Sequence, residues 1–290
     1  MADLVKLPKP LRKALRRLRL RCEYKPRLWA RIVANGFRPR RVLAFPEVPL
    51  PNTTFYKLCH LHGFSLTRNP ALPADLAIWW EDATVRRPCP ALGQRVLNQG
   101  CGDISKSRVD AVHAEVFGYS AAIDPTTYVG PCVRKSDRNA VHDGTVLEAP
   151  IGRAEPGFVY QLLLDNRVSD GLVEDLRLYV FGGRVPLCCR SRRKLAERFS
   201  NDVVEAFLID AREVLSEEEA DRVQRFCRGM GLDYGELDAV RDASSGRLYV
   251  VDVNNTPFGP PAKVIRNLDR GQVFQTLSRP FLDMMSSSVG

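Results

Sequence analysis

Short apolar runs alternate with helix signals through residues 41–100. Four of these runs have the length and composition of buried strands: RVLAF (41–45), FSLT (64–67), DLAIWW (75–80) and RVLN (95–98). After the first run, Asn52 is placed to cap a helix over residues 53–62, which Gly63 ends. Strands and helices that alternate at this spacing predict a small parallel α/β subdomain.

The pattern changes after residue 100. Residues 103–117 predict a helix that begins at Asp103 or Ser105 and ends at Gly118. Strand-like runs follow at 128–135, 158–164 and 176–181, and the last of these turns at Gly182-Gly183 into residues 185–189. This part of the chain therefore predicts antiparallel β structure.

The clearest helix signal covers residues 216–228, where Ser216 and Glu219 form the S-x-x-E capping box. Gly229 and Gly231 end this helix. The segments YGELDAVRD (234–242) and RLYVVDVNN (247–255), joined by a Ser-Ser-Gly turn, then predict a β-hairpin.

Side-chain alternation gathers the polar residues of this hairpin on one surface. In the second strand we expect Val251 and Val253 on one face and Asp252 and Asn254 on the other, with Asp238 joining them from the first strand. Three hard oxygen donors on a rigid scaffold suit Mg²⁺. The alternative is the solvent-exposed face of an ordinary antiparallel hairpin.

The net charge of +9 is unevenly distributed along the chain. Residues 1–41 contain 14 Lys or Arg and only two acids, a net charge of +12, so the remainder carries −3. Within this segment Leu11, Leu15 and Leu18 recur at helical spacing, and Pro26 predicts a break or kink. Three roles are open for this helix: docking one face on the body, attraction to an anionic membrane surface or acidic partner, and nucleic-acid binding. Scarce aromatic residues disfavour nucleic acid.

The cysteines and the hydropathy of the chain indicate the cellular compartment in which the protein is expected. The eight cysteines form no CxxC pair, which disfavours a zinc ribbon, and they predict free thiols in a reducing environment. The N-terminus lacks a signal-peptide pattern, and no uncharged apolar run approaches the roughly 18–20 residues of a membrane helix. We therefore expect a cytoplasmic protein.

Residues 231–257 resemble the C-terminal metal-binding hairpin of the ATP-grasp superfamily. In that hairpin an acid on one strand and an (E/D)-x-N on the next hold Mg·ATP before a short proline turn, as in D-alanine–D-alanine ligase. The spacing of Asp238, Asp252 and Asn254 matches, with Asp252 where Glu is more frequent. The resemblance implies ATP and one or two Mg²⁺ ions as cofactors, with these three residues as metal ligands.

The ATP-grasp resemblance also implies an α/β (α+β) fold with a small N-terminal parallel subdomain and with antiparallel sheets in its central and C-terminal subdomains. We expect a basic helical segment over 1–40, the N-terminal subdomain over 41–100, the central subdomain over 101–165 and the C-terminal subdomain over 166–290.

The upstream order of motifs is similar to the superfamily as well. Its first ATP lysine opens a helix, as Lys106 does in DISK, and its second ends a strand before a phosphate-covering loop, as Lys135 does in YVGPCVRK. Lysines in these positions neutralise phosphate charge. The loop here has only one glycine and implies contacts from Ser136, Asn139 or His142.

The next strand, VYQLLLDN, resembles the adenine hinge, where backbone groups from Gln161 to Leu163 would contact the base. The motif EDLR is similar to the D-x-R element that follows, which implies Asp175 at the ribose hydroxyls, with Glu174 as a competitor. Arg177 and one arginine of the basic turn CRSRRK would hold phosphate or an anionic substrate through fork geometry. The candidates in this turn are Arg190, Arg192 and Arg193.

Most ATP-grasp enzymes phosphorylate a carboxylate and then let an amine or thiol attack the acylphosphate. The resemblance therefore implies a ligase that joins a small-molecule carboxylate to an amine, with no dedicated general base visible in the sequence. Two alternatives are a phosphotransferase on the same fold and a non-catalytic nucleotide-binding module docked by its basic N-terminus.

Overall fold

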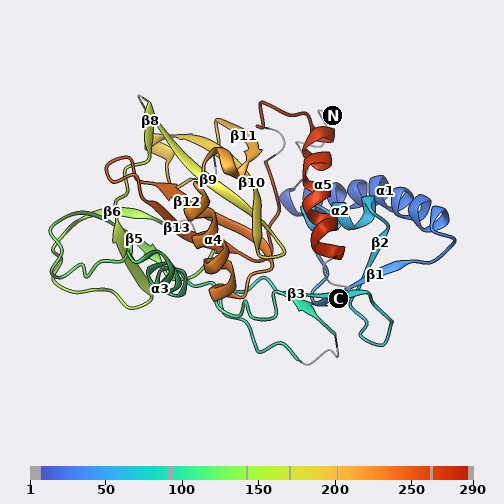
Figure 1. Cartoon of the computed structure of the whole chain (residues 1–290). Coiled ribbons are helices and arrows are strands. Elements are labelled where there is room, and N and C mark those ends of the chain that lie inside the picture. The colour runs from blue at the N-terminus through green and yellow to red at the C-terminus, as the bar shows by residue number, and fades with distance from the viewer. Residues whose placement is uncertain are drawn as a thin grey trace.

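The computed structural model describes residues 8–90, 94–141, 143–169, 171–200, 202–261 and 264–286. The first seven residues of the basic segment and His142 lie outside the described residues. The strands form three sheets, arranged from the N-terminal unit through a large central sheet to a smaller sheet at the other end of the molecule (Figure 1). Within the described part of the chain, no helix is long and apolar enough to cross a membrane.

The N-terminal sheet has the order β2-β1-β3-β4 and is parallel throughout. Its strands are β1 (Arg40–Pro46), β2 (Phe64–Thr67), β3 (Leu76–Trp80) and β4 (Val96–Leu97). The predicted parallel α/β unit is thus confirmed. Helix α2 (Thr54–Leu61) is capped by Thr53, whose Oγ1 accepts from Tyr56 N at 3.3 Å, so the predicted Asn52 cap was wrong by one residue.

Helix α1 (Lys9–Ala34) continues through Pro26, so the predicted break was wrong. Pro26 is exposed, where water can satisfy the backbone carbonyl that a proline leaves without a donor. One face of α1 packs on α2 through Tyr24 and Tyr56, and Tyr24 also meets Phe274 of α5 (Arg270–Ser286) at a ring-centroid distance of 6.4 Å. The docked-face interpretation of this helix is confirmed.

A three-stranded antiparallel sheet of order β6-β5-β7 follows in the chain. It comprises β5 (Gly130–Ser136), β6 (Thr145–Ala149) and β7 (Phe158–Leu162). Helix α3 (Lys106–Phe117) precedes it, with Ser105 as the N-cap and Gly118, at φ +80°, closing the C-terminus. Of the two predicted starts, Ser105 is therefore the one observed.

The large antiparallel sheet has the order β11-β10-β9-β12-β13, with β8 (Arg167–Ser169) paired to β9. Its main strands are β9 (Leu172–Phe181), β10 (Arg184–Lys194), β11 (Glu205–Asp210), β12 (Tyr234–Arg241) and β13 (Leu248–Asn254). Short 3₁₀ turns, η2 (Leu195–Glu197) and η3 (Ala211–Glu213), flank β11, and α4 (Glu217–Met230) begins with the predicted Ser216–Glu219 capping box.

The two faces of the large sheet have different partners. Helices α3 and α4 pack on one face through an apolar cluster that includes Leu178, Leu237 and Val253. On the other face, aromatic side chains at one end of the strands pack against the N-terminal unit and α5, with Phe55 4.9 Å from Tyr234 between ring centroids. The opposite end of that same face carries polar residues and is where the candidate site lies.

Gly231 connects α4 to the N-terminal unit. It ends α4 at φ +63°, and a Cβ added there would lie 2.4 Å from the carbonyl carbon of Gly100. Gly246 has a similar φ of +70°, but an added Cβ would meet nothing within 4 Å.

We therefore expect Gly246→Ala to lower the free energy of unfolding by about 1 kcal/mol through left-handed backbone strain alone. Gly231→Ala should lose about 1–3 kcal/mol more, because the backbone of Gly100 must move. Urea denaturation of both variants measures the difference, and equal losses would show that the contact with Gly100 is not tight.

Candidate functional site

The hairpin of β12 and β13 brings two carboxylates together. Asp238 pairs directly with Asp252 in the antiparallel register, which then shifts by one residue so that Ala239 pairs with Val250. This bulge at Val251 changes the parity of the strand: Val250 and Val253 both pack in the helix-covered core, while Val251 lines the cavity on the other face. The expectation that Val251 and Val253 share a face was therefore wrong.

Arg177 of β9 fixes Asp238 through a forked ion pair. Its Nε donates to Asp238 Oδ1 at 2.7 Å and its Nη2 donates to Oδ2 at 3.1 Å. Glu236 lies beside this pair, with Oε2 3.7 Å from Arg177 Nη1. The Asp238 carboxylate raises the pKa of Arg177 well above its usual value, while burial raises the pKa of Glu236 to about 7 against the opposing effect of Arg177. The guanidinium thus holds one of the two facing carboxylates in place.

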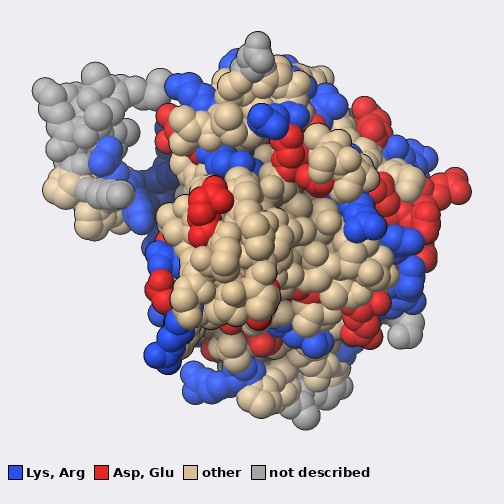
Figure 2. All heavy atoms as spheres, turned by 90° about the vertical axis from the view of Figure 1, so that its left-hand side faces the viewer, with Lys and Arg blue, Asp and Glu red and all other residues tan. Residues whose placement is uncertain are grey.

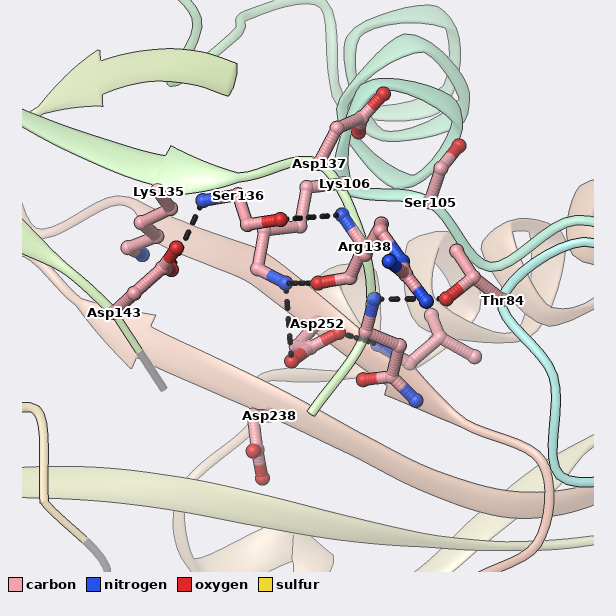
Figure 3. Close-up of polar contacts among 12 residues, drawn as sticks. Thr84, Ser105, Lys106, Lys135, Ser136, Asp137, Arg138, Asp143, Asp238 and Asp252 are labelled. Atoms are coloured by element: carbon pink, nitrogen blue, oxygen red, sulfur yellow. Dashed lines mark hydrogen bonds and ion pairs between the residues drawn. The ribbon is translucent and has the colours of Figure 1, made fainter. Parts of the chain in front are cut away.

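Lys106 reaches the same point from the first turn of α3. Its Nζ donates to the carbonyl of Arg138 at 2.8 Å and lies 4.0 Å from Asp252 Oδ2 (Figure 3). Burial raises the pKa of Asp252, and the positive charge of Lys106 opposes this. The loop after β5 folds over the start of α3, since Lys106 N donates to the carbonyl of Asp137 at 3.1 Å.

Lys135 approaches from β5 and donates to Gln161 Oε1 at 3.2 Å. Burial lowers its pKa to about 8, with Asp252 the largest effect in the opposite direction. Its neighbour Ser136 does not line the cavity: its N–H donates to Asp143 Oδ1 at 3.0 Å, and Asp143 lines the cavity instead (Figure 3).

Strands β9 and β10 divide the remaining candidates between two faces. Asp175 and Arg193 lie on the cavity face, where they form an ion pair, and Asn166 Nδ2 donates to the other oxygen of Asp175 at 3.0 Å. Ser191, which pairs with Asp175 in the sheet, lines the cavity between them.

Glu174, Arg190 and Arg192 lie on the opposite face. Glu174 Oε2 is 3.1 Å from Arg192 Nε and 3.7 Å from Arg190 Nε, and none of these three residues lines the cavity. Arg192 also donates to Glu205 at 3.0 Å. The predicted site positions of Arg190 and Glu174 were wrong for a simple reason: side chains alternate along each strand, so only every second residue of CRSRRK, here Ser191 and Arg193, faces the cavity.

One cavity collects most of the predicted residues between the large sheet and the three-stranded sheet. Its described lining residues include charged groups of both signs and the apolar side chains of Leu162 and Leu164, which form an apolar end. Leu163 is not part of the lining. The five cations and four carboxylates that line it are Lys106, Lys135, Arg177, Arg193, Arg198, Asp143, Asp175, Asp238 and Asp252.

The polar lining residues that the sequence interpretation missed include Asp143, Asn166, Ser191 and Arg198. Arg198 Nη2 donates to the carbonyl of Leu164 and to Asn166 Oδ1, both at 2.9 Å, so it closes the apolar end. Strand alternation with Arg193 was a usable signal for Ser191. The other three lie in loops, where spacing gives no equivalent signal.

The oxygen donors fit Mg²⁺ that arrives with a nucleotide. Within the described residues, no group of three or more His, Cys, Asp or Glu side chains is arranged to hold a metal ion alone. Asp238 and Asp252 supply two facing carboxylates, while Asn254 uses its Oδ1 to accept from Thr256 N at 3.0 Å and does not line the cavity. Mg²⁺ commonly takes one or two carboxylates and completes its shell with phosphates and water.

No protein-family model matches this sequence, and no curated protein matches it significantly. Solved structures do match. ATP-grasp ligase PsnB with minimal precursor, Mg and ADP matches at a TM-score of 0.55 and 15% identity, over 85% of this chain and 97% of that one. PsnB with precursor peptide PsnA2 and AMPPNP gives 0.52 and 16%, over 84% and 96%. In a third PsnB complex, with a phosphomimetic precursor variant, the match has a TM-score of 0.48 and 20% identity and covers 67% of this chain and only 63% of that one.

The chain therefore has the ATP-grasp fold, and the predicted fold class is confirmed. At these identities the likeness establishes the fold alone, so the activity rests on the chemistry of the cavity.

The buried charge of Lys135 yields a prediction about stability. Because its folded pKa of about 8 lies below the ordinary value of 10.5, the unfolded chain binds more protons between these values. Stability should therefore rise with pH through this window. Lys135→Met should raise the free energy of unfolding at pH 7 by about 2 kcal/mol and reduce the increase in stability between pH 8 and pH 10.5. The same substitution should weaken nucleotide binding.

Lys57 provides the matched control, since burial lowers its pKa to about 8 as well, but it lies beside Phe274 under α1. Lys57→Met should also flatten the pH dependence and should leave nucleotide binding unchanged. Denaturation at several pH values and ADP titration measure both effects. If the two variants bound ADP with equal affinity, a role of Lys135 in nucleotide binding would be contradicted.

Proposed function

We propose that this protein is a Mg²⁺-dependent ligase that uses ATP to join a carboxylate to an amine through an acylphosphate. One observation carries the proposal: Lys106 and Lys135, from two different elements, converge on the facing carboxylates Asp238 and Asp252 inside one cavity. Two facing acids and two lysines suit a bound metal–polyphosphate, because the carboxylates offset the charge of the metal ion and the lysines offset the charge of the phosphates.

We assign each part of the nucleotide to a part of the cavity. The apolar end at Leu162 and Leu164, next to Gln161, suits the adenine ring, and Asp175, oriented by Arg193 and Asn166, suits the ribose hydroxyls. Lys106 and Lys135 would neutralise the phosphates. Mg²⁺ held by Asp238 and Asp252, with Asn254 adjacent, would neutralise phosphate charge further.

The reaction has two steps. A substrate carboxylate oxygen attacks the γ-phosphorus, and the bond to the β-phosphate oxygen breaks so that ADP leaves with the electron pair. The amine nitrogen then attacks the acyl carbon, the C–O bond to phosphate breaks, and the amine proton passes to phosphate or water. The contribution of the chain is positioning and charge neutralisation, with Arg177 and Arg193 as the cavity cations opposite the lysines.

The nature of the carboxylate is the open part of the proposal. PsnB, which shares the fold, was solved with a precursor peptide. Peptide carboxylates therefore belong beside small acids in any substrate screen for this chain.

Product analysis tests the reaction class. ADP release is screened against pools of acids, peptides and amines, and mass spectrometry identifies the product of each active pair. We expect a condensation product and free phosphate. A stable phosphorylated compound without condensation would show a phosphotransferase, and nucleotide binding without turnover in any pool would favour a binding module.

The two faces of β10 give a matched pair of variants. Arg193→Gln should lower kcat/KM for ATP-dependent turnover at least about tenfold, because it removes a cavity cation. Arg190→Gln, on the opposite face beside Glu174, should change it by less than about twofold. Equal losses would contradict the assignment of Arg193 to the site.

A further inference from the structure

Helix α1 has two apolar faces, and among the described residues only one of them packs against the rest of the chain. The docked face consists of Leu20, Tyr24, Leu28 and Ile32, whose exposed fractions are between 2% and 9%. These residues recur every fourth position and face the N-terminal unit, where Arg31 Nε also donates to the carbonyl of Leu61 at 3.2 Å. Docking therefore fixes the rotation of α1 about its own axis.

The second apolar face consists of Leu11, Leu15, Leu18, Trp29 and Val33, whose exposed fractions range from 37% to 61%. On a helix that turns 100° per residue these positions fall within a stripe about 60° wide, whose centre is rotated by about 130° from the centre of the docked face. A stripe of five large apolar side chains along a 26-residue helix is more than the scattered exposed residues of an ordinary surface.

Positive charge borders this stripe on both sides. Arg12 and Arg19 lie along one edge, and Lys25 lies along the other, by the same helical geometry. Glu23 is the only acid in the sequence of α1. Its carboxylate is engaged with Arg27 at 3.2 Å and Arg270 at 3.4 Å, beside the docked face.

The rest of the surface does not share this charge. Residues 42–290 carry a net charge of −3. The end of the molecule that lies on the left in Figure 1, away from α1, carries Lys and Arg mixed with Asp and Glu around a largely uncharged centre (Figure 2). The excess of positive charge is therefore a local property of the helical segment.

We propose that the outer face of α1 binds an anionic phospholipid surface, with its axis parallel to the membrane plane. The apolar stripe matches the acyl boundary and the bordering Lys and Arg match the anionic headgroups, the arrangement that interfacial amphipathic helices use. Phosphate binding by nucleic acid accounts for the cations but not for the leucines and Trp29. An acidic protein partner would need its own apolar ridge of the same length.

The membrane would bring the enzyme to carboxylate or amine substrates that are themselves lipid-linked or surface-bound. This consequence rests on the proposed ligase function, whereas membrane binding by α1 does not.

Tryptophan fluorescence reports on the stripe directly. The chain has three tryptophans, of which Trp29 is 61% exposed and both Trp79 and Trp80 are only 4% exposed. Vesicles of phosphatidylcholine with about 30% phosphatidylglycerol should shift the emission to shorter wavelength and sediment with the protein. Pure phosphatidylcholine vesicles should do neither, and Trp29→Phe should abolish the shift while retaining sedimentation.

A variant in the apolar stripe and a control outside α1 test whether the stripe carries the binding. Leu18→Glu should weaken vesicle binding at least about tenfold, because an acid enters the centre of the stripe. Val129→Glu, at a 79% exposed valine outside α1, should leave binding unchanged. Both positions are exposed, so both variants should fold, and circular dichroism checks this.

Two results would overturn the proposal. One is absence of any shift or sedimentation with anionic vesicles. The other is an equal fluorescence shift of the protein with soluble duplex DNA or polyglutamate, which would assign the same face to nucleic acid or to an acidic protein.

Discussion

The direct pairing of Asp238 with Asp252 is the constraint on which the candidate site depends. Like charges opposite each other on neighbouring strands destabilise a sheet, and burial adds to the cost, as the raised pKa of Asp252 shows. Three cations offset this: Arg177 holds Asp238 in a fork, Lys106 lies 4.0 Å from Asp252, and Lys135 acts on Asp252 through a longer range. The cations and carboxylates of the site therefore offset one another. A metal–nucleotide complex fits among them because its metal ion can pair with the carboxylates and its phosphates with the cations.

The surrounding fold keeps this network in register. Asn98, at the end of β4, donates through Nδ2 to the carbonyl of Tyr234 at 2.7 Å and accepts from Tyr234 N at 2.9 Å, so the N-terminal unit fixes the start of β12. At the same open end of the hairpin, the carbonyl of Phe258 in the proline turn after β13 accepts from Thr54 N at 3.0 Å, where α2 begins. The entry to β12 and the exit from β13 are thus both tied to the N-terminal unit, which lies outside the cavity.

Much of this arrangement follows from local rules that the sequence displays. The capping box at Ser216 and the helix start at Lys106 each depend on neighbouring residues only, and each is observed. The ATP-grasp resemblance added the relative order of the lysines and the hairpin, and Lys106, Lys135, Asp238 and Asp252 line one cavity; their roles toward ATP and Mg²⁺ stay predictions. The boundaries of the subdomains at residues 40, 100 and 165 stay predictions.

Other features depend on contacts between distant segments and could not be predicted. The bulge at Val251 changes the parity of β13 without any signal in the valine-rich run, and Arg198 reaches Asn166 across a separation of 32 residues. Helix α5 was not predicted, and it packs on α1, α2 and the large sheet, in contacts that only the folded chain creates. The division of β10 into two faces was predictable, since the alternation that separates Arg190 from Arg193 is the same rule that grouped Asp252 with Asn254 in the sequence analysis.

The central claim is that the facing carboxylates bind a metal together with a nucleotide, and calorimetric titration of ADP with and without Mg²⁺ tests it most directly. For the natural protein, Mg²⁺ should tighten ADP binding at least about tenfold, and for Asp252→Asn the effect of Mg²⁺ should fall below about twofold. An unchanged effect of Mg²⁺ in the variant, or ADP binding by the natural protein that does not respond to Mg²⁺, would contradict the account.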